Sequence, residues 1–370
     1  MRGVTLRAVE ADDRDAVNAL VRDHGFKTRS AAGWRWLFGG PPRAAPAVAG
    51  WVLEQEGELR GYLGNHVLAY VRGGRELVAA TCSSLYVHPA ARAASASLMR
   101  VWLRQPGVAL FLSTSANAAS RGVYELYGAR SPAEPCFREG YIWAADEGDL
   151  LREGLERLGA PPGAARALGR TLGPVARGLR RVARLTRPRA TRFHGEVREV
   201  APREVGAAFD ALARRLRASG ALQVSRDAAA LRWYLADPDA AAPPCVLGAF
   251  DAEGLAAYTI GGRHCAPGRR VSELRVLDLA FRPDAADAVG PLLAGLVARA
   301  REVGAGLVYC PPCGPQLAPV LRAHRPYLHH LAHARHYLRA GDAAIQAELD
   351  RPGAWHATGL DGDSPFALVG

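Results

Sequence analysis

The chain has 370 residues, which is enough for two domains of ordinary size, and 49% of them are hydrophobic. It has no stretch of about 18 apolar residues and no signal-like hydrophobic segment near the N-terminus, so we expect a cytoplasmic protein with no membrane partner. The formal net charge is +11, but Lys27 is the only lysine, an arginine bias typical of GC-rich coding sequences. The charge alone is therefore weak evidence for a nucleic-acid partner.

The first half of the chain alternates strands and helices. Apolar residues with a period of two predict strands, and a helix begins at Asp12. Two of the strands form a hairpin through Glu56-Gly57-Glu58, and further helices flank the last strand. The predicted strands are residues 4–10, 51–56, 60–71, 76–87 and 109–113. This order predicts an α/β fold with a mixed sheet.

The second half repeats landmarks of the first at a nearly constant distance. Trp36 and Trp233 are 197 residues apart, and Pro89 and Pro283 are 194 residues apart. We infer an internal duplication that gives two tandem domains of one fold. The predicted parts are an N-terminal domain at 1–145, an arginine-rich linker at 146–197, a C-terminal domain at 198–340 and a tail at 341–370.

A strand that ends near Pro89 leads through a loop of small residues into a helix. The loop from Arg92 to Ser97 contains only Ala and Ser after its arginine. The start of a helix presents unpaired backbone N–H groups, which attract phosphates, and small side chains let a pyrophosphate approach them. Arg92 stands at the rim, where its guanidinium can pair with the anion. The stretch therefore predicts a pyrophosphate site.

Two motifs resemble those of the GCN5-related N-acetyltransferases. The stretch from Val87 to Ser97 is similar to the acyl-CoA loop V-x-P-x-x-R-G-x-G-x-G/A of that family, with Arg92 at the arginine and Ala or Ser at all three glycines. The stretch from Asn117 to Gly128 is similar to N-x-x-A-x-x-x-Y-x-x-x-G, with Tyr124 at the tyrosine. The resemblance implies two GNAT-like domains, with specific residues supporting it only in the first.

The resemblance also implies a reaction and a set of roles. The reaction is transfer of an acyl group from acetyl-CoA or another acyl-CoA to an amine of a small molecule or peptide. Tyr124 is the implied general acid to the departing thiolate, and a backbone N–H near Tyr86 polarises the thioester carbonyl. The general base stays open. The implied acyl-CoA-binding residues are Tyr86, Val87, Arg92, Ala93, Ser95, Ala96, Ser97 and Asn117.

Trp34 and His88 are candidate substrate-binding residues. Trp34 and Trp36 are two residues apart and cannot share a helix face, and Trp36 has a repeat counterpart, which favours a core position for Trp36. Trp34 is then the residue expected to line an acceptor pocket. His88 adjoins the loop, where a neutral imidazole can act as the general base on the acceptor amine, although a solvated histidine at a strand end explains it as well. Glu54 and Glu56 are candidates for the base only by position, since a hairpin turn explains them too, and a water relay would leave no side chain to find.

The C-terminal copy lacks the chemistry of the first loop. It carries Asp284 and Asp287 where a pyrophosphate would bind, and Leu321 stands opposite Tyr124, so we expect it to be inactive towards CoA.

Two other functions of the whole protein stay open. One is an aminoacyl transferase that takes its donor group from tRNA and uses the arginine-rich linker. The other is a non-catalytic ligand-binding or scaffold protein with two degenerate domains.

A competing pattern is Cys310-Pro-Pro-Cys313 with His329 and His333, whose spacing falls within the range of zinc sites. The repeat places the cysteines and histidines on different elements, so we predict no metal site. A redox-active Cys pair is the second alternative.

The linker arginines are expected to form a solvated surface, and the alternative is contact with tRNA, acidic lipid or the 3′-phosphate of CoA. The sequence leaves the oligomeric state open.

Overall fold

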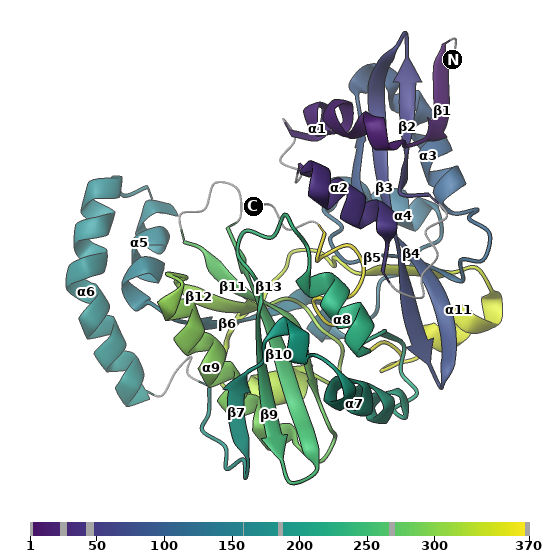
Figure 1. The fold of residues 1–370 in the computed structure, drawn as a ribbon. Helices are drawn as coiled ribbons and strands as arrows, with labels where there is room; N and C mark the ends of the chain where they lie inside the picture. The colour runs from purple at the N-terminus through teal and green to yellow at the C-terminus, as the bar shows by residue number, and fades with distance from the viewer. Residues whose placement is uncertain are drawn as a thin grey trace. The chain divides into compact units, whose positions relative to one another are not determined.

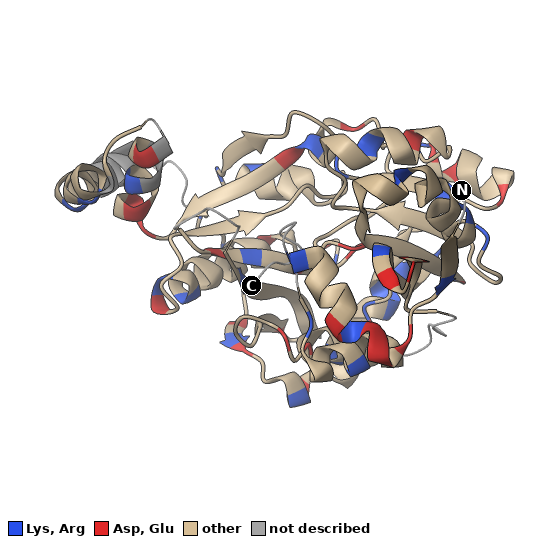
Figure 2. Ribbon diagram, turned by 90° about the horizontal axis from the view of Figure 1, so that it is seen from above, with Lys and Arg blue, Asp and Glu red and all other residues tan. Residues whose placement is uncertain are grey.

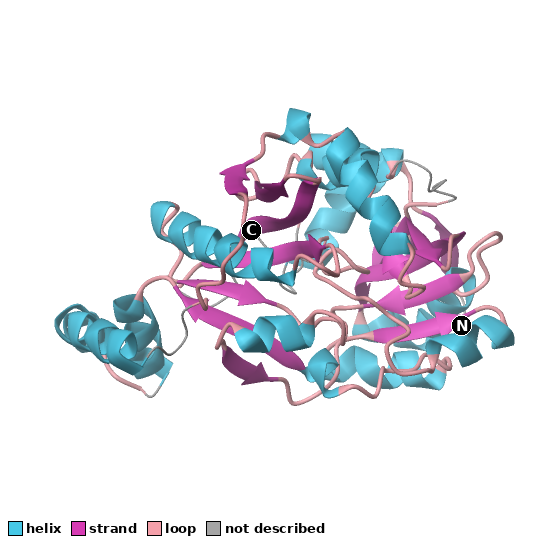
Figure 3. Cartoon of the chain, turned by 90° about the horizontal axis from the view of Figure 1, so that it is seen from below, coloured by secondary structure: helices cyan, strands magenta, loops and turns pink. Residues whose placement is uncertain are grey.

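A computed structural model describes residues 3–22, 28–41, 48–157, 159–183, 188–265 and 271–366. The chain forms two compact units (Figure 1). Each is built around a seven-stranded mixed sheet with helices outside it (Figure 3). The first unit comprises Met1–Phe137, Arg217–Asp239 and His333–Val369, and the second comprises Arg138–Leu216 and Ala240–Ala332. The predicted α/β class with mixed sheets is confirmed.

The sheet of the first unit has the strand order β1-β2-β3-β4-β5-β14, with β8 paired to the far end of β3. Neighbours are antiparallel except β4 and β5, which are parallel. All five strands predicted in the first half are present. Their bounds, with the two strands from the second half, are β1 Val4–Ala8, β2 Gly50–Gln55, β3 Glu58–Arg72, β4 Arg75–Val87, β5 Leu110–Ser113, β8 Gln223–Val224 and β14 Tyr337–Ala340.

Helices cover both faces of this sheet. On one face α3 (Ser95–Trp102) and α4 (Ala118–Leu126) bury Leu98, Trp102 and Tyr124 against the strands. On the other face α1 (Arg14–Arg22) and α2 (Ala31–Gly39) pack on Val52 and Tyr62. The remaining helices of this unit are α8 (Ala228–Leu235) and α11 (Ala343–Leu349). The first unit thus has a core on each side of the sheet.

The sheet of the second unit has the order β13-β6-β12-β11-β10-β9-β7, and again one pair, β11 and β12, is parallel. Its strands are β6 Glu139–Ala144, β7 Glu196–Glu199, β9 Cys245–Asp251, β10 Gly254–His264, β11 Glu273–Phe281, β12 Leu307–Cys310 and β13 Tyr327–His330. Its helices are α5 Glu147–Arg157, α6 Pro162–Ala183, α7 Ala207–Arg217, α9 Val289–Glu302 and α10 Ala318–Ala323. Basic and acidic residues are interspersed over both units (Figure 2).

The two sheets repeat one strand order but exchange their sixth strands. The run β1-β2-β3-β4-β5 corresponds to β7-β9-β10-β11-β12, which supports the predicted duplication. However, β14 from the second half pairs with β5, and β6 from the first half pairs with β12. The sheets therefore divide the chain differently from the continuous boundaries expected at residues 145 and 340. Both exchanged strands pair antiparallel to the last parallel strand of the other copy, which completes its ladder.

The C-terminal tail belongs to the first unit. Trp355 and Asp361 are buried there, and the indole Nε1 of Trp355 donates to Asp361 Oδ1 at 2.9 Å. The N–H of Gly362 donates to the Tyr70 hydroxyl at 3.1 Å. Gly362 has φ +63, and a Cβ there would lie 2.6 Å from Thr114 Oγ1. Only glycine fits this close approach of the tail to the end of β5.

We expect Gly362→Ala to destabilise the protein by at least about 2 kcal/mol more than Gly107→Ala. Both glycines have positive φ, so both substitutions incur the same kind of backbone strain, but a Cβ at Gly107 meets nothing within 4 Å. The difference between the two variants in thermal or urea unfolding therefore isolates the overlap with Thr114. Equal losses of stability would show that the tail is not held against β5 as described.

Candidate active site

The site lies where β4 and β5 separate. The two strands pair along Ala79–Thr81 and Leu110–Leu112, and β4 then continues to Val87. The edge of β4 that follows Thr81 is outside the ladder with β5. A fork between parallel strands gives an extended ligand access to a strand backbone from one side.

A β-bulge distorts β4 within this fork. Tyr62 pairs with Tyr86 and Gly64 pairs with Ser83, so Ser84 and Leu85 together face a single residue of β3. Ser84 has φ +52, a left-handed conformation that is uncommon for a residue other than glycine. A bulge bends the strand and turns its backbone groups, and such strain is often found at functional sites. The carboxyl end of β4, with Tyr86 and Val87, is therefore re-aimed just before the loop.

The predicted pyrophosphate loop forms a short helical turn, Pro89–Ala94, followed directly by α3. Arg92 and Ala93 are exposed, and Ser95, Ala96 and Ser97 are half-buried. Ala94 at the N-cap of α3 offers no side-chain cap, and the first turn has no acidic residue. Small side chains, a helix start without a side-chain cap and one exposed arginine fit a pyrophosphate. The acyl-CoA-binding role of these residues stays a prediction.

Two predicted site residues act as local caps. The Nδ1 of His88 accepts the backbone N–H of Ala90 at 3.2 Å, which starts the turn. The side-chain oxygen of Asn117 accepts the N–H groups of Ala119 and Ser120 at 3.0 and 2.9 Å, which caps α4. These structural roles account for both residues in the ligand-free chain. Roles in substrate or acyl-CoA binding are additional predictions.

The two tryptophans of α2 are arranged opposite to our expectation. Trp34 is 5% exposed and packs in the core with Val17 and Tyr62, so its position does not support the predicted acceptor pocket. Trp36 is half-buried, and its ring stacks on Trp233 with centroids 4.2 Å apart. The repeat counterpart of Trp36 is thus its stacking partner.

Tyr124 places its hydroxyl at the fork. The ring is 5% exposed and packs on Tyr337 and Trp102 at centroid distances of 5.8 and 6.5 Å. The side chains of Ser113 and Cys82 are its polar neighbours. Ser113 is the last residue of β5, and Cys82 follows the parallel ladder on β4. Burial, with smaller contributions from Cys82 and Asp363, raises the pKa of Tyr124 well above 10. The phenol is therefore protonated at neutral pH.

Asp363 of the tail is a buried carboxylate beside this tyrosine, and the sequence analysis did not single it out. Its carboxylate accepts the backbone N–H of Thr114 at 2.6 Å and the Ser113 hydroxyl at 3.3 Å, and it also accepts the Ser115 hydroxyl. Burial raises its pKa, although the hydrogen bonds from Ser115 and Thr114 oppose the rise. The available signals were the polar runs Ser113-Thr114-Ser115 and Asp361–Ser364, which lie far apart in the chain.

His66 is a second buried polar residue next to the bulge. Its Nε2 lies 2.8 Å from the Ser83 hydroxyl, and its ring stacks on Phe366 of the tail at 4.0 Å. Burial, with a smaller effect of Arg29, lowers the pKa of His66 to about 3. An imidazole with so low a pKa is a poor base for an ammonium group, so Asp363 is the better candidate.

Solved structures with this architecture have been described. A GCN5-related N-acetyltransferase from Anabaena variabilis aligns over 94% of this chain and 75% of its own, with 12% identity and a TM-score of 0.57. A structure of Saccharomyces cerevisiae N-myristoyltransferase with bound myristoyl-CoA aligns over 100% and 86%, with 11% identity and a TM-score of 0.57. The chain has the GCN5-related N-acetyltransferase fold.

A further structure with the GNAT fold, from Kribbella flavida, covers 94% of this chain and 73% of its own at 16% identity and a TM-score of 0.53. No protein-family model matches the sequence. No curated protein matches it. At these identities the likeness establishes the GNAT fold, and the chemistry must be argued from the side chains.

The second GNAT-like sheet differs at the position of the loop. Arg282 at the end of β11 is paired with Asp251 at 2.6 Å and with Asp284 at 3.2 Å. Leu321, opposite Tyr124 in the repeat, is fully buried in α10. These contacts are consistent with a structural role for the second loop.

The alternative motifs receive little support. Cys310 and Cys313 are buried, burial raises the pKa of the Cys313 thiol, and His329 and His330 lie on β13. Among the described residues, no group of three or more His, Cys, Asp or Glu side chains is placed to hold a metal.

In the linker, Arg184 and Arg187 lie outside the described residues, as do the side chains of Arg177, Arg180 and Arg181. The prediction of a solvated surface and its alternative, contact with tRNA, acidic lipid or the 3′-phosphate of CoA, therefore both stay untested.

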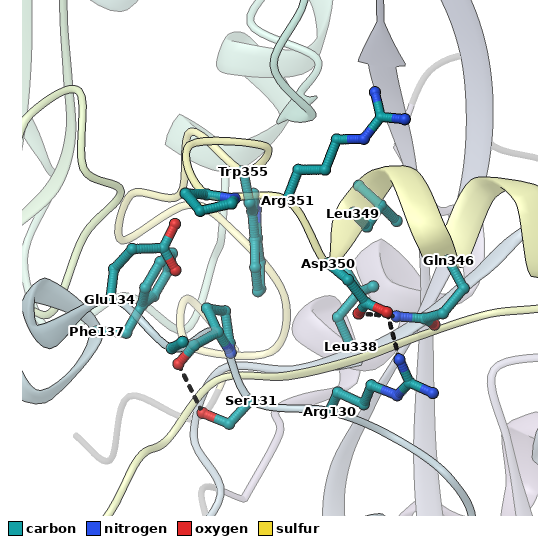
Figure 4. A pocket seen from close by; sticks show the side chains of 13 residues that line it. Arg130, Ser131, Glu134, Phe137, Leu338, Gln346, Leu349, Asp350, Arg351 and Trp355 are labelled. Atoms are coloured by element: carbon teal, nitrogen blue, oxygen red, sulfur yellow. Dashed lines mark hydrogen bonds and ion pairs between the residues drawn. The ribbon is translucent and has the colours of Figure 1, made fainter.

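A separate cavity of about 410 Å³ opens between the loop after α4 and the segment around α11 (Figure 4). Arg130 pairs with Asp350, and Gln346 donates to Asp350 at 2.9 Å. Glu134 accepts the N–H of Gly353 at 2.8 Å. Because these polar groups bind one another, none of these contacts points to a particular ligand.

Proposed function

We propose that the first unit transfers an acyl group from acyl-CoA to an amine. The observation that carries the proposal is the protonated hydroxyl of Tyr124 at the fork between β4 and β5, beside a loop that fits a pyrophosphate. The neighbours with the same fold include N-acetyltransferases and an N-myristoyltransferase with bound myristoyl-CoA, which supports a thioester donor. Acetyl-CoA is the donor that we propose to test first.

The donor is bound by the chain's loop and by the distorted strand. Arg92 and the N–H groups at the start of α3 hold the pyrophosphate, and Ala93, Ser95 and Ser97 allow it close to the backbone. The thioester then lies along the carboxyl end of β4, where a backbone N–H near Tyr86 polarises the carbonyl oxygen. The bulge at Ser84 sets the direction of that N–H.

The reaction moves two protons, and we assign one side chain to each of them. The amine nitrogen attacks the thioester carbonyl, the C–N bond forms, and the C–S bond breaks. Tyr124 gives its proton to the departing sulfur. The amine loses one proton, and we assign it to the Asp363 carboxylate, reached directly or through the Ser115 hydroxyl. Two titratable groups in different environments thus serve as acid and base.

The acceptor is a small-molecule or peptide amine, and the reaction takes place in the cytoplasm. The second unit is inactive towards CoA in this proposal. Asp284 and Asp287 stand where the first loop has Arg92 and small residues, and their negative charges would repel a pyrophosphate. An aminoacyl-tRNA donor and a non-catalytic binding role are the alternatives that the experiments must distinguish.

Calorimetry with acetyl-CoA is expected to show one site, weakened by about tenfold or more in Arg92→Glu, since a charge-assisted hydrogen bond is lost and a like charge is introduced. The matched control is Arg100→Glu, an exposed arginine at the other end of α3 with the same change of net charge. Unchanged binding in Arg92→Glu, or an equal loss in both variants, would refute the loop assignment. Two sites would refute the inactive second unit.

A further inference from the structure

The helical pair α5–α6 of the second unit packs in an unusual way. In Figure 1, α6 lies on the side of α5 away from the sheet. The contact uses three small residues of α6, Ala165, Gly169 and Gly173, all buried. A Cβ at Gly169 would lie 2.7 Å from the carbonyl oxygen of Gly148 on α5, so the two backbones are in close contact. Small residues at every fourth position allow such close helix packing.

Three large apolar residues of α6 lie to one side of this contact, outside it. Leu168, Leu172 and Val175 are 42%, 43% and 56% exposed and recur at the spacing of one helix face. We call these three residues the α6 stripe. A helix that only has to pack on its own domain buries its leucines and leaves glycine outside. The reverse arrangement indicates that a partner covers the α6 stripe.

The charge of α6 restricts that partner. The helix carries Arg166, Arg170, Arg177, Arg180 and Arg181 and no Asp or Glu. Arg166 and Arg170 are exposed, and each precedes a leucine of the stripe by two residues, or about 200° around the helix. The helix therefore has an apolar side and, opposite it, a cationic side, which is the pattern of basic amphipathic helices that lie on membrane surfaces.

Three kinds of partner can be compared on this basis. A second copy of the chain would bring two α6 helices of equal positive charge together, which costs energy. A nucleic acid would pair with the arginines but leave the α6 stripe in water. An anionic bilayer surface can take up the leucines at the boundary of its acyl chains and attracts the net positive charge of the helix, as it does for other basic amphipathic helices.

We propose that α6 docks on the surface of an anionic lipid bilayer, with the α6 stripe at the boundary between headgroups and acyl chains. The helix lies on the surface in this arrangement; no helix in the described ranges is both long and apolar enough to span a membrane. The proposal departs from our sequence-based expectation of no membrane partner. It does not depend on the acyltransferase activity.

The test is sedimentation of the full-length protein with vesicles at near-physiological ionic strength. Vesicles of mixed phosphatidylglycerol and phosphatidylcholine should bind the protein, and vesicles of phosphatidylcholine alone should bind it at least about tenfold more weakly. Leu172→Glu should weaken binding to the anionic vesicles at least about tenfold, because it removes a leucine that the bilayer would bury and adds a charge that the anionic surface repels. Val175→Glu is a second variant at an exposed position, in case the first does not fold.

The matched control is Leu126→Glu, which makes the same change at a leucine that is 80% exposed in the first unit. It should bind the anionic vesicles like the wild type. The proposal is overturned if anionic vesicles do not bind, or if Leu172→Glu and Leu126→Glu behave alike. A dimer that Leu172→Glu dissociates would instead identify a second copy as the occupant. Binding of transfer RNA in preference to vesicles, unaffected by Leu172→Glu, would identify a nucleic-acid partner.

Discussion

Tyr124→Phe is expected to lower turnover by about 10²-fold or more while leaving the affinity for acyl-CoA nearly unchanged. The substitution keeps the ring that packs on Trp102 and Tyr337 and removes only the hydroxyl at the fork. Without it the thiolate must leave unprotonated or take its proton from water. Steady-state kinetics on the variant, together with calorimetry of donor binding, separate the two effects.

The matched control for this prediction is Tyr337→Phe. Tyr337 stacks on Tyr124, but its own hydroxyl donates to Glu125 at 3.2 Å. It should keep wild-type turnover if the effect belongs to the Tyr124 proton. Because burial raises the pKa of Tyr124 well above 10, its loss of a proton should not cause an alkaline decline at ordinary pH. Wild-type turnover in Tyr124→Phe would make the residue a packing residue and favour the tRNA or non-catalytic alternatives.

The parts of the fold that follow from local patterns could be predicted. The alternation from residue 76 to 87 identifies β4, and the β2–β3 hairpin turns at Glu56 and Gly57, both at positive φ, where the sequence places it. The repeat, found from the spacing of Trp36 and Trp233, corresponds to the repeated strand order. These features depend on neighbours in the sequence or on a constant offset.

The exchange of β6 and β14 could not be predicted in the same way. A period of two identifies a strand but does not say which sheet it joins, and both strands are short. The helix periodicity likewise could not tell which of Trp34 and Trp36 is buried, because helices α2 and α8 pack together through Trp36 and Trp233. In both cases a contact between residues more than 160 positions apart decides the outcome.

The candidate site was predicted in part for a similar reason. The loop at Arg92 and the tyrosine of α4 have motifs, and the structure brings the end of β4 and Tyr124 to one fork. Asp363 has no motif, and its hydrogen bond to Thr114 joins residues 249 positions apart. A single acidic residue in a C-terminal tail is expected to be exposed to solvent. Only the structure shows that this tail is buried.

Asp363→Asn is expected to lower kcat by about 10²-fold or more, which is within the usual contribution of a general base. Asparagine has the same shape and can still accept the N–H of Thr114, but it cannot take a proton from the amine. The hydrogen bonds from Thr114, Ser113 and Ser115 hold the carboxylate at the end of β5, so the geometry should survive the change. Kinetics and a thermal melt of the same sample measure the two effects separately.

Asp361→Asn is the matched control, since Asp361 is a buried carboxylate of the same tail. Its carboxylate accepts the N–H of Thr358 at 2.8 Å and the indole N–H of Trp355, whereas at the end of β5 only its backbone carbonyl takes part, accepting the Thr114 hydroxyl at 2.7 Å, and Asp361→Asn leaves that carbonyl in place. We expect it to lower the melting temperature and to keep turnover. If both variants lose turnover equally, the tail is only a structural support, and the base must be sought elsewhere.

The pH dependence gives the sharpest check on Asp363. A base must be deprotonated to act, so turnover should fall as pH falls through the pKa of Asp363, which burial raises above its usual 3.8. This acid limb should disappear in Asp363→Asn. The effect on stability has the opposite sign: a raised pKa in the folded state favours folding when the group is protonated, and this contribution is lost as pH rises through the folded pKa. The stability of Asp363→Asn relative to wild type should therefore increase with pH. An acid limb that persists in the variant would exclude Asp363 as the base.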